Sequence, residues 1–156
     1  MHARGFTLIE LVITLAIIGL LATAAMPLAQ MTARREKESD LRAALRDIRT
    51  AIDAYKLASD TGHIQKEADK SGYPPDLKSL YMGVPDAASP DNKMQYFLRR
   101  VPRDPFFPDS TVAGEDTWGL RSSVSPPDDP QPGDDVYDVH SLSGEKGLSG
   151  VPYREW

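Results

Sequence analysis

The chain of 156 residues contains no cysteine. A disulfide-stapled scaffold, a zinc site built from thiolates and a cysteine nucleophile are therefore excluded. Catalytic patterns are also lacking, since no HExxH, GxSxG or GxxxxGK[ST] pattern occurs. The three histidines are His2, His63 and His140, widely spaced along the chain. We therefore predict that the protein is not an enzyme.

Basic residues are scarce in the last third of the chain. Between Asp104 and Trp156 there are eleven Asp or Glu against three Lys or Arg, a net charge of −8, whereas the whole chain carries −5. An acidic surface repels phosphates, so we expect no nucleic-acid partner. The aspartate pairs 128–129 and 134–135 lie among prolines, and we expect them to be solvated in an exposed loop.

Charge is almost absent from residues 6–29, where Glu10 is the only ionisable side chain. Twenty-four helical residues span roughly 36 Å, which is enough to cross a bilayer core of about 30 Å. The threonines of this run can return hydrogen bonds to helix carbonyls, which makes them tolerable in lipid. Arg4 precedes the run and favours a cytoplasmic N-terminus.

Three interpretations of this segment are open. A cleaved secretory signal would use Leu11–Leu21 as its apolar region and Ala22-Thr23-Ala24 as its cleavage site, but Glu10 lies where such a signal needs apolar residues. A plain membrane anchor would bury Glu10 without benefit. A third interpretation gives Glu10 a role.

The segment Gly5-Phe6-Thr7-Leu8-Ile9-Glu10-Leu11 resembles the type III signal of type IV prepilins and type II secretion pseudopilins. That signal is a short basic leader ending in glycine, then an apolar residue, with glutamate at the fifth mature position. The resemblance implies that a prepilin peptidase cuts between Gly5 and Phe6 and that the Phe6 amine is N-methylated. It also implies that Glu10 pairs with Phe6 of a neighbouring subunit and sets the register of a filament, a use of buried charge for specificity.

Two residues of the apolar run favour a bend in its helix. Pro27 removes a backbone donor and crowds the preceding turn, and Gly19 adds a weak point. Pro27 falls at the twenty-second mature position, where the prepilin-like family commonly has a proline. The bend is either a tolerated membrane-helix kink or a means by which subunits leave the membrane and pack, and both explanations stand.

The run from Met31 to Lys56 has no glycine or proline and predicts a continuing amphipathic helix. Its apolar stripe consists of Leu41, Ala44, Leu45, Ile48, Ile52 and Tyr55. The charges between them are expected to face solvent, with Arg49 paired to Asp53 one turn away. We expect the helix to end near residues 58–61, before Gly62.

The remaining sequence predicts short elements and long loops. Asp76 is expected to cap a short helix reaching Leu80. Residues 117–124 and 136–141 are predicted strands of an antiparallel pair, joined by the proline-rich loop 125–135. Three prolines exclude regular structure between 102 and 108, and the aromatic residues of 151–156 are expected to dock on the domain.

Segments of this half resemble the major pseudopilin of type II secretion systems, the G subunit. They are Gly72-Tyr73-Pro74, Tyr96–Pro105 with its Pro-x-Asp-Pro, Trp118-Gly119 and Tyr137–Ser141. The resemblance implies a calcium-binding C-terminal loop rich in Gly and Asp. Residues 142–150 contain no Asp, and Lys146 repels a cation, so we expect no cofactor; Asp138 and Glu145 are the remaining weak candidates for calcium.

The sequence thus predicts an α+β, pilin-like fold: a long N-terminal helix, transmembrane in its first half, packed on a small antiparallel sheet. The expected division is a cleaved leader (1–5), a transmembrane and filament-core segment (6–29) and a periplasmic globular domain (30–156). The expected function is that of a structural subunit of a type II secretion pseudopilus, anchored once in the bacterial inner membrane and extracted into a periplasmic filament. The expected partners are the prepilin peptidase, other pseudopilins, and the assembly platform with its ATPase. The alternative is a subunit of a type IV pilus or related filament serving adhesion, motility or DNA uptake.

Overall fold

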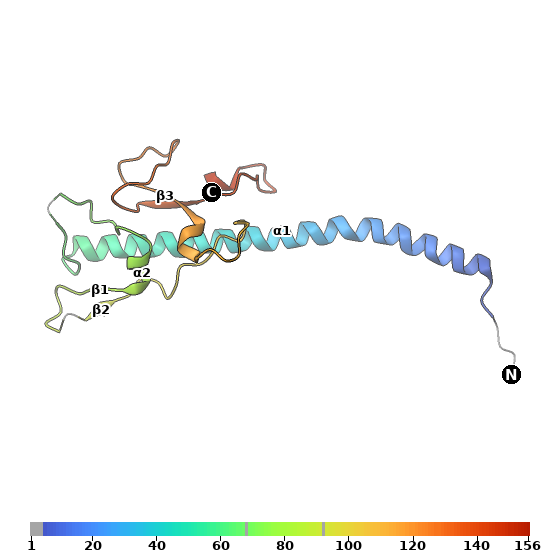
Figure 1. Cartoon of the computed structure of the whole chain (residues 1–156), viewed down its shortest axis with the longest axis horizontal. Coiled ribbons are helices and arrows are strands. Elements are labelled where there is room, and N and C mark those ends of the chain that lie inside the picture. The colour runs from blue at the N-terminus through green and yellow to red at the C-terminus, as the bar shows by residue number, and fades with distance from the viewer. Residues whose placement is uncertain (1–4, 68, 92) are drawn as a thin grey trace. The chain divides into compact units, whose positions relative to one another are not determined.

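The computed structural model describes residues 5–67, 69–91 and 93–156 (Figure 1). The chain forms two compact units, one reaching Lys37 and one running from Glu38 to Trp156. The expected division at residue 30 followed the end of the apolar run. Glu38 is the first buried residue among those of α1 whose burial the structure describes, and the expected division at residue 30 stays a prediction.

The longest element is helix α1, Leu8–Asp60, which runs through both units. Its end lies within the predicted range of 58–61. Gly62 adopts a φ of 81°, a left-handed conformation that favours glycine, and its N–H donates to the carbonyl of Ser59 at 3.2 Å. The N–H of His63 donates to the carbonyl of Ala58 at 2.8 Å, so the last turn of the helix is closed by backbone hydrogen bonds.

The second half of α1 supplies the core of the C-terminal unit. The predicted stripe is confirmed, since all six of its residues are buried: Leu41, Ala44, Leu45, Ile48, Ile52 and Tyr55. They belong to one cluster with Trp118, Val136, Val139 and Tyr153 from the C-terminal third of the chain. In Figure 1 the hairpin of strands β1 (Val84–Pro85) and β2 (Met94–Gln95) and the strand β3 (Trp118–Arg121) lie on opposite sides of this half of α1.

Strands β3 (Trp118–Arg121) and β4 (Asp138–Ser141) form an antiparallel pair, which confirms the predicted strands and the loop that joins them. Leu120 lies opposite Val139, and Gly119 lies opposite His140. A Cβ atom on Gly119 would stand 2.1 Å from the His140 ring, so this position needs glycine for the close approach of the ring.

A second antiparallel pair, β1 (Val84–Pro85) with β2 (Met94–Gln95), was not predicted. Two residues per strand are too few to show an alternating pattern. The short helix α2, Lys78–Met82, precedes it. The N-cap residue of this helix is Leu77, one residue after the predicted Asp76, but Asp76 Oδ1 does accept the N–H of Ser79 in the first turn at 2.8 Å.

The prolines between 102 and 108 exclude regular structure, as predicted, yet this segment is tightly held. Asp104 is fully buried and accepts the N–H of Phe106 at 2.8 Å and the hydroxyl of Ser141, in β4, at 2.5 Å. Trp118 Nε1 donates to the Pro102 carbonyl at 2.8 Å. Side-chain hydrogen bonds therefore replace the backbone ladder that the prolines prevent.

The prediction that Arg49 faces solvent and pairs with Asp53 is wrong. The Arg49 side chain is partly buried, and its Nε donates to Asp138 in β4 at 2.8 Å. A helix-surface pair contributes only about 0.3–0.5 kcal/mol. A planar guanidinium that donates to several fixed acceptors contributes more to stability. Arg49 therefore pairs with Asp138 and not with Asp53.

The core predicts a large difference between two apolar positions of α1. Ile48→Ala removes a fully buried side chain and should lower the free energy of unfolding by about 2–5 kcal/mol. Leu57→Ala, whose side chain is 64% exposed on the same helix, should change it by less than about 0.5 kcal/mol. Urea unfolding of the full chain in detergent, followed by near-ultraviolet circular dichroism, measures both. Equal effects of the two substitutions would contradict the assigned core.

Candidate functional site

The residues ahead of α1 are those that sequence analysis singled out for cleavage. Gly5 and Phe6 lie in extended chain before the helix, both exposed, and Phe6 is 90% exposed. A Cβ atom on Gly5 would meet no other group within 4 Å. This peptide bond is therefore open to an enzyme from outside. Residues 1–4, including His2 and Arg4, lie outside the described residues.

Thr7 and Glu10 close the first turn of α1 as a capping box. The Glu10 carboxylate accepts the backbone N–H and the hydroxyl of Thr7, both at 2.8 Å, and the Glu10 N–H donates to the Thr7 hydroxyl at 3.3 Å. Such a box satisfies helix donors that otherwise have no partner. Sequence analysis missed it, although a threonine three residues before a glutamate is its ordinary signal.

The first part of α1 is apolar on every side and exposed. It holds the one stretch of the described chain that is long and apolar enough to cross a membrane, judged by length and composition. The hydroxyls of Thr14 and Thr23 donate to the carbonyls of Glu10 at 2.6 Å and Leu20 at 2.7 Å, as predicted. The polar groups of these threonines are thus satisfied inside the helix, which suits a lipid surrounding.

Gly19 and Pro27 both lie inside α1, and the residues on either side of each are helical. A Cβ atom on Gly19 would meet no other group within 4 Å, so nothing in this chain needs glycine there. The bend expected at these two positions stays a prediction.

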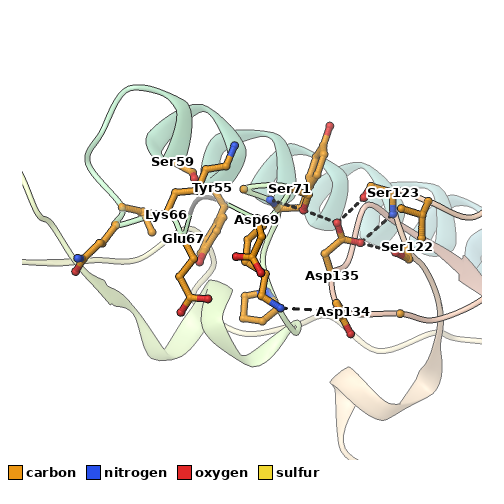
Figure 2. A pocket seen from close by; sticks show the side chains of 18 residues that line it. Tyr55, Ser59, Lys66, Glu67, Asp69, Ser71, Ser122, Ser123, Asp134 and Asp135 are labelled. Atoms are coloured by element: carbon orange, nitrogen blue, oxygen red, sulfur yellow. Dashed lines mark hydrogen bonds and ion pairs between the residues drawn. The ribbon is translucent and has the colours of Figure 1, made fainter.

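In the C-terminal unit the most heavily hydrogen-bonded carboxylate is that of Asp135 (Figure 2). It accepts the hydroxyl of Ser122 at 2.6 Å, the N–H and hydroxyl of Ser123 at 2.8 and 2.5 Å, and the hydroxyl of Ser71. Burial raises the pKa of this carboxyl, but the hydrogen bonds outweigh burial and lower the pKa to about 2. The expectation that Asp135 is solvated is wrong, whereas Asp128, Asp129 and Asp134 are exposed.

Asp135 lines a cavity of about 590 Å³ (Figure 2). Its other charged side chains have both signs, and Lys70 and Asp134 are 3.6 Å apart across it.

The two histidines of the described chain also have structural surroundings. His63 Nδ1 lies 3.0 Å from Asp86, and this contact holds the pKa of the Asp86 carboxyl below its usual range. Burial lowers the pKa of His140, whose ring covers Gly119. Among the described residues, no three His, Asp or Glu side chains are grouped so that they could hold a metal ion.

Comparison with known proteins gives one consistent result. Residues 1–26 match the family described as the prokaryotic N-terminal methylation motif. Type II secretion system core protein G of Escherichia coli K12 is 32% identical over 130 residues, which cover 78% of this chain and 79% of that protein. This chain belongs to the core protein G family. The proteins of the same name from Klebsiella michiganensis (28% identical, 85% of this chain and 88% of that protein) and Dickeya chrysanthemi (31%, 66% and 63%) are similar as well. No solved structure matches the chain at the same level of significance.

The core protein G relatives confirm the family that the sequence predicted, including the choice of the G subunit. The long helix with small antiparallel sheets is the expected pilin-like α+β fold. The apolar stretch of α1 with the methylation motif fits a pseudopilin anchored by a single membrane helix. A role as a structural subunit of a pseudopilus follows from this membership.

The calcium that the family resemblance implies does not fit the C-terminal loop of this core protein G relative. Asp138 is already paired, 2.8 Å from Arg49 Nε and 3.6 Å from a nitrogen of Arg121. The other candidate, Glu145, is the only carboxylate between residues 142 and 150, whereas calcium takes six to eight oxygens. Sequence analysis did not single out Glu38. This residue is buried, and its carboxylate accepts a hydrogen bond from the N–H of Leu148 in the loop.

The low pKa of Asp135 predicts a stability change at acid pH. Because its folded-state pKa of about 2 lies below the usual 3.8, this carboxylate contributes stability above pH 4, which is lost as pH falls through 2. The contribution is about 2 kcal/mol. Asp135→Asn should therefore show a flatter loss of stability between pH 5 and pH 2 than the wild type. Asp134→Asn, at a side chain 92% exposed, is the control and should follow the wild type. Parallel urea-midpoint curves for all three proteins would contradict the assignment.

Proposed function

We propose that this protein is a structural subunit of a type II secretion pseudopilus, the filament that helps move folded proteins across the outer membrane. The observation that carries the proposal is the arrangement of the N-terminus: an exposed Gly5–Phe6 bond, then a capped apolar helix, in a chain of the core protein G family. Membership of that family favours the pseudopilus over the alternative of a type IV pilus.

The first step is cleavage of the Gly5–Phe6 bond by a prepilin peptidase on the cytoplasmic side of the inner membrane. Water adds across the peptide bond, which leaves a carboxylate on Gly5 and a new amine on Phe6. Glycine suits this position because it has no side chain to obstruct a tight protease cleft. The same class of enzyme then methylates the Phe6 amine. This protein is the substrate of both steps.

Glu10 sets the register of the assembled filament. Its carboxylate is held at the head of α1 by Thr7, the residue next to the new amine of Phe6. The Phe6 ammonium of one subunit pairs with Glu10 of its neighbour when the apolar helices pack. In an apolar surrounding an unpaired charge is strongly unfavourable, so subunits shifted out of register are rejected.

The membrane and the assembly apparatus complete the proposal. Before assembly the helix spans the inner membrane once, with the C-terminal unit in the periplasm. Its exposed apolar side chains are then transferred from lipid to the filament core, where contact with other pseudopilins keeps them from water. Energy for extraction comes from an assembly platform and its ATPase, because this chain has no nucleotide-binding pattern. Gly19 and Pro27 supply the bend that packing needs.

Processing is tested by the intact mass and N-terminal sequence of the protein from membranes of its native host. The expected chain begins at Phe6 and carries one added methyl group. A chain beginning near Ala25 would overturn the proposal in favour of a secretory signal. An intact Met1 would instead support a plain anchor.

The charge of Glu10 is tested by Glu10→Gln. Glutamine is also found in capping boxes, so the start of α1 should be retained while the ionic pair is lost. We expect normal membrane insertion and cleavage but at least about tenfold fewer filaments in a shearing assay, since breaking a buried ion pair costs roughly 3–5 kcal/mol. Thr7→Ala, which weakens the cap and keeps the charge, is the matched comparison. Normal assembly of Glu10→Gln would show that capping alone is the role of Glu10.

A further inference from the structure

Arg49 occupies a position where its positive charge is surrounded by oxygen atoms of the C-terminal third of the chain. Its Nε donates to Asp138 Oδ1 at 2.8 Å, and one terminal nitrogen donates to the backbone oxygens of Val139 at 3.2 Å and Trp156 at 2.8 Å. One carboxylate and two backbone oxygens are the kinds of ligand that calcium takes. In this protein the guanidinium of Arg49 donates hydrogen bonds to these three oxygen acceptors.

Glu38, about three turns earlier on the same helix, is an anion that accepts hydrogen bonds from the C-terminal segment. Its side chain is 6% exposed, and its Oε1 accepts the N–H of Leu148 at 2.7 Å and the hydroxyl of Tyr153 at 3.1 Å. Arg42 lies 3.8 Å from its other oxygen. The loop therefore turns a hydrogen-bond donor toward an anion, whereas a loop that binds calcium turns oxygen acceptors inward.

Aromatic side chains also pack at the base of the C-terminal loop. Tyr153 is fully buried and stacks on Phe106 with ring centroids 4.1 Å apart, and Trp156 packs edge-on against it. The Arg42 guanidinium lies 4.1 Å from the centre of a Trp156 ring. A Cβ atom on Gly147 would stand 2.5 Å from that tryptophan, so the loop is already in close contact with it.

We propose that fixed charges of α1, the cation Arg49 and the anion Glu38, hold the C-terminal segment 138–156 in place of a bound calcium ion. The order of this segment is then independent of calcium. An ion held by ligands from a loop orders that loop only when it is bound, but a charge on a helix is always present. These contacts lie within one chain and do not depend on the proposed role in a filament.

The first test measures calcium dependence in the unaltered full chain in detergent. Thermal unfolding and hydrogen–deuterium exchange of peptides from 142–156 are recorded in EGTA and in about 5 mM CaCl2, which exceeds the dissociation constants of weak calcium sites. We expect the same Tm within about 1 °C and the same exchange in both. A calcium site filled to a hundred times its Kd would instead raise Tm by about 10 °C. Such a rise, or slower exchange of the loop with calcium, would overturn the proposal.

The second test removes each charge. Arg49→Met keeps the length of the side chain but removes its donors, and Glu38→Ala removes the anion. Each should speed exchange of 142–156 by about tenfold or more, because hydrogen bonds to charged groups are lost, while the core peptide around Ile48 stays protected. Arg46→Met and Asp40→Ala, at exposed positions of the same helix, are the matched controls and should leave exchange unchanged. Unchanged exchange in both Arg49→Met and Glu38→Ala would refute the proposal that these two charges hold the segment 138–156. If either variant fails to fold, the calcium measurement on the unaltered chain still decides the proposal.

Discussion

The C-terminal unit depends on one constraint, the need to cover the apolar stripe of α1 between Leu41 and Tyr55. Each of the two sheets has only two short strands, and a sheet of that size is not stable by itself in water. The helix supplies the continuous apolar surface on which both the hairpin and the β3–β4 pair are organised. A loop-rich chain with no disulfide can therefore fold as one unit, because one rigid element contributes to every part of its core.

Buried carboxylates connect loops to helices and strands where no backbone hydrogen-bond ladder does so. Glu38, Asp104 and Asp135 each lie at less than a tenth of full exposure, and each accepts hydrogen bonds from segments distant in sequence. They tie the C-terminal loop to α1, the proline-rich segment to β4, and the loop before β4 to the end of β3. Removing any one of them would leave buried donors without partners, so these acids fix the path of the loops between them.

The helix, the strands β3 and β4 and the prepilin-like N-terminus were predictable, because each shows a periodicity or a motif over neighbouring residues. The roles of Arg49, Glu38 and Asp135 were not. Their partners lie 64 to 110 residues away in several cases, and only the folded chain brings them together. A charge on a polar helix face looks the same in sequence whether it meets water or a distant carboxylate. The Thr7–Glu10 box was predictable in principle, because a threonine three residues before a glutamate at the start of an apolar run is its ordinary signal.

The capping box lies on the C-terminal side of the proposed cleavage point, which bears on the order of processing and helix formation. Helix α1 begins at Leu8, and its first donors are satisfied by Thr7 and Glu10, both downstream of the Gly5–Phe6 bond. The hydrogen bonds of this capping box join Thr7 and Glu10 to each other. Cleavage after Gly5 would therefore leave both partners of the box in the mature chain. The same local cap would then be available to the helix before and after processing.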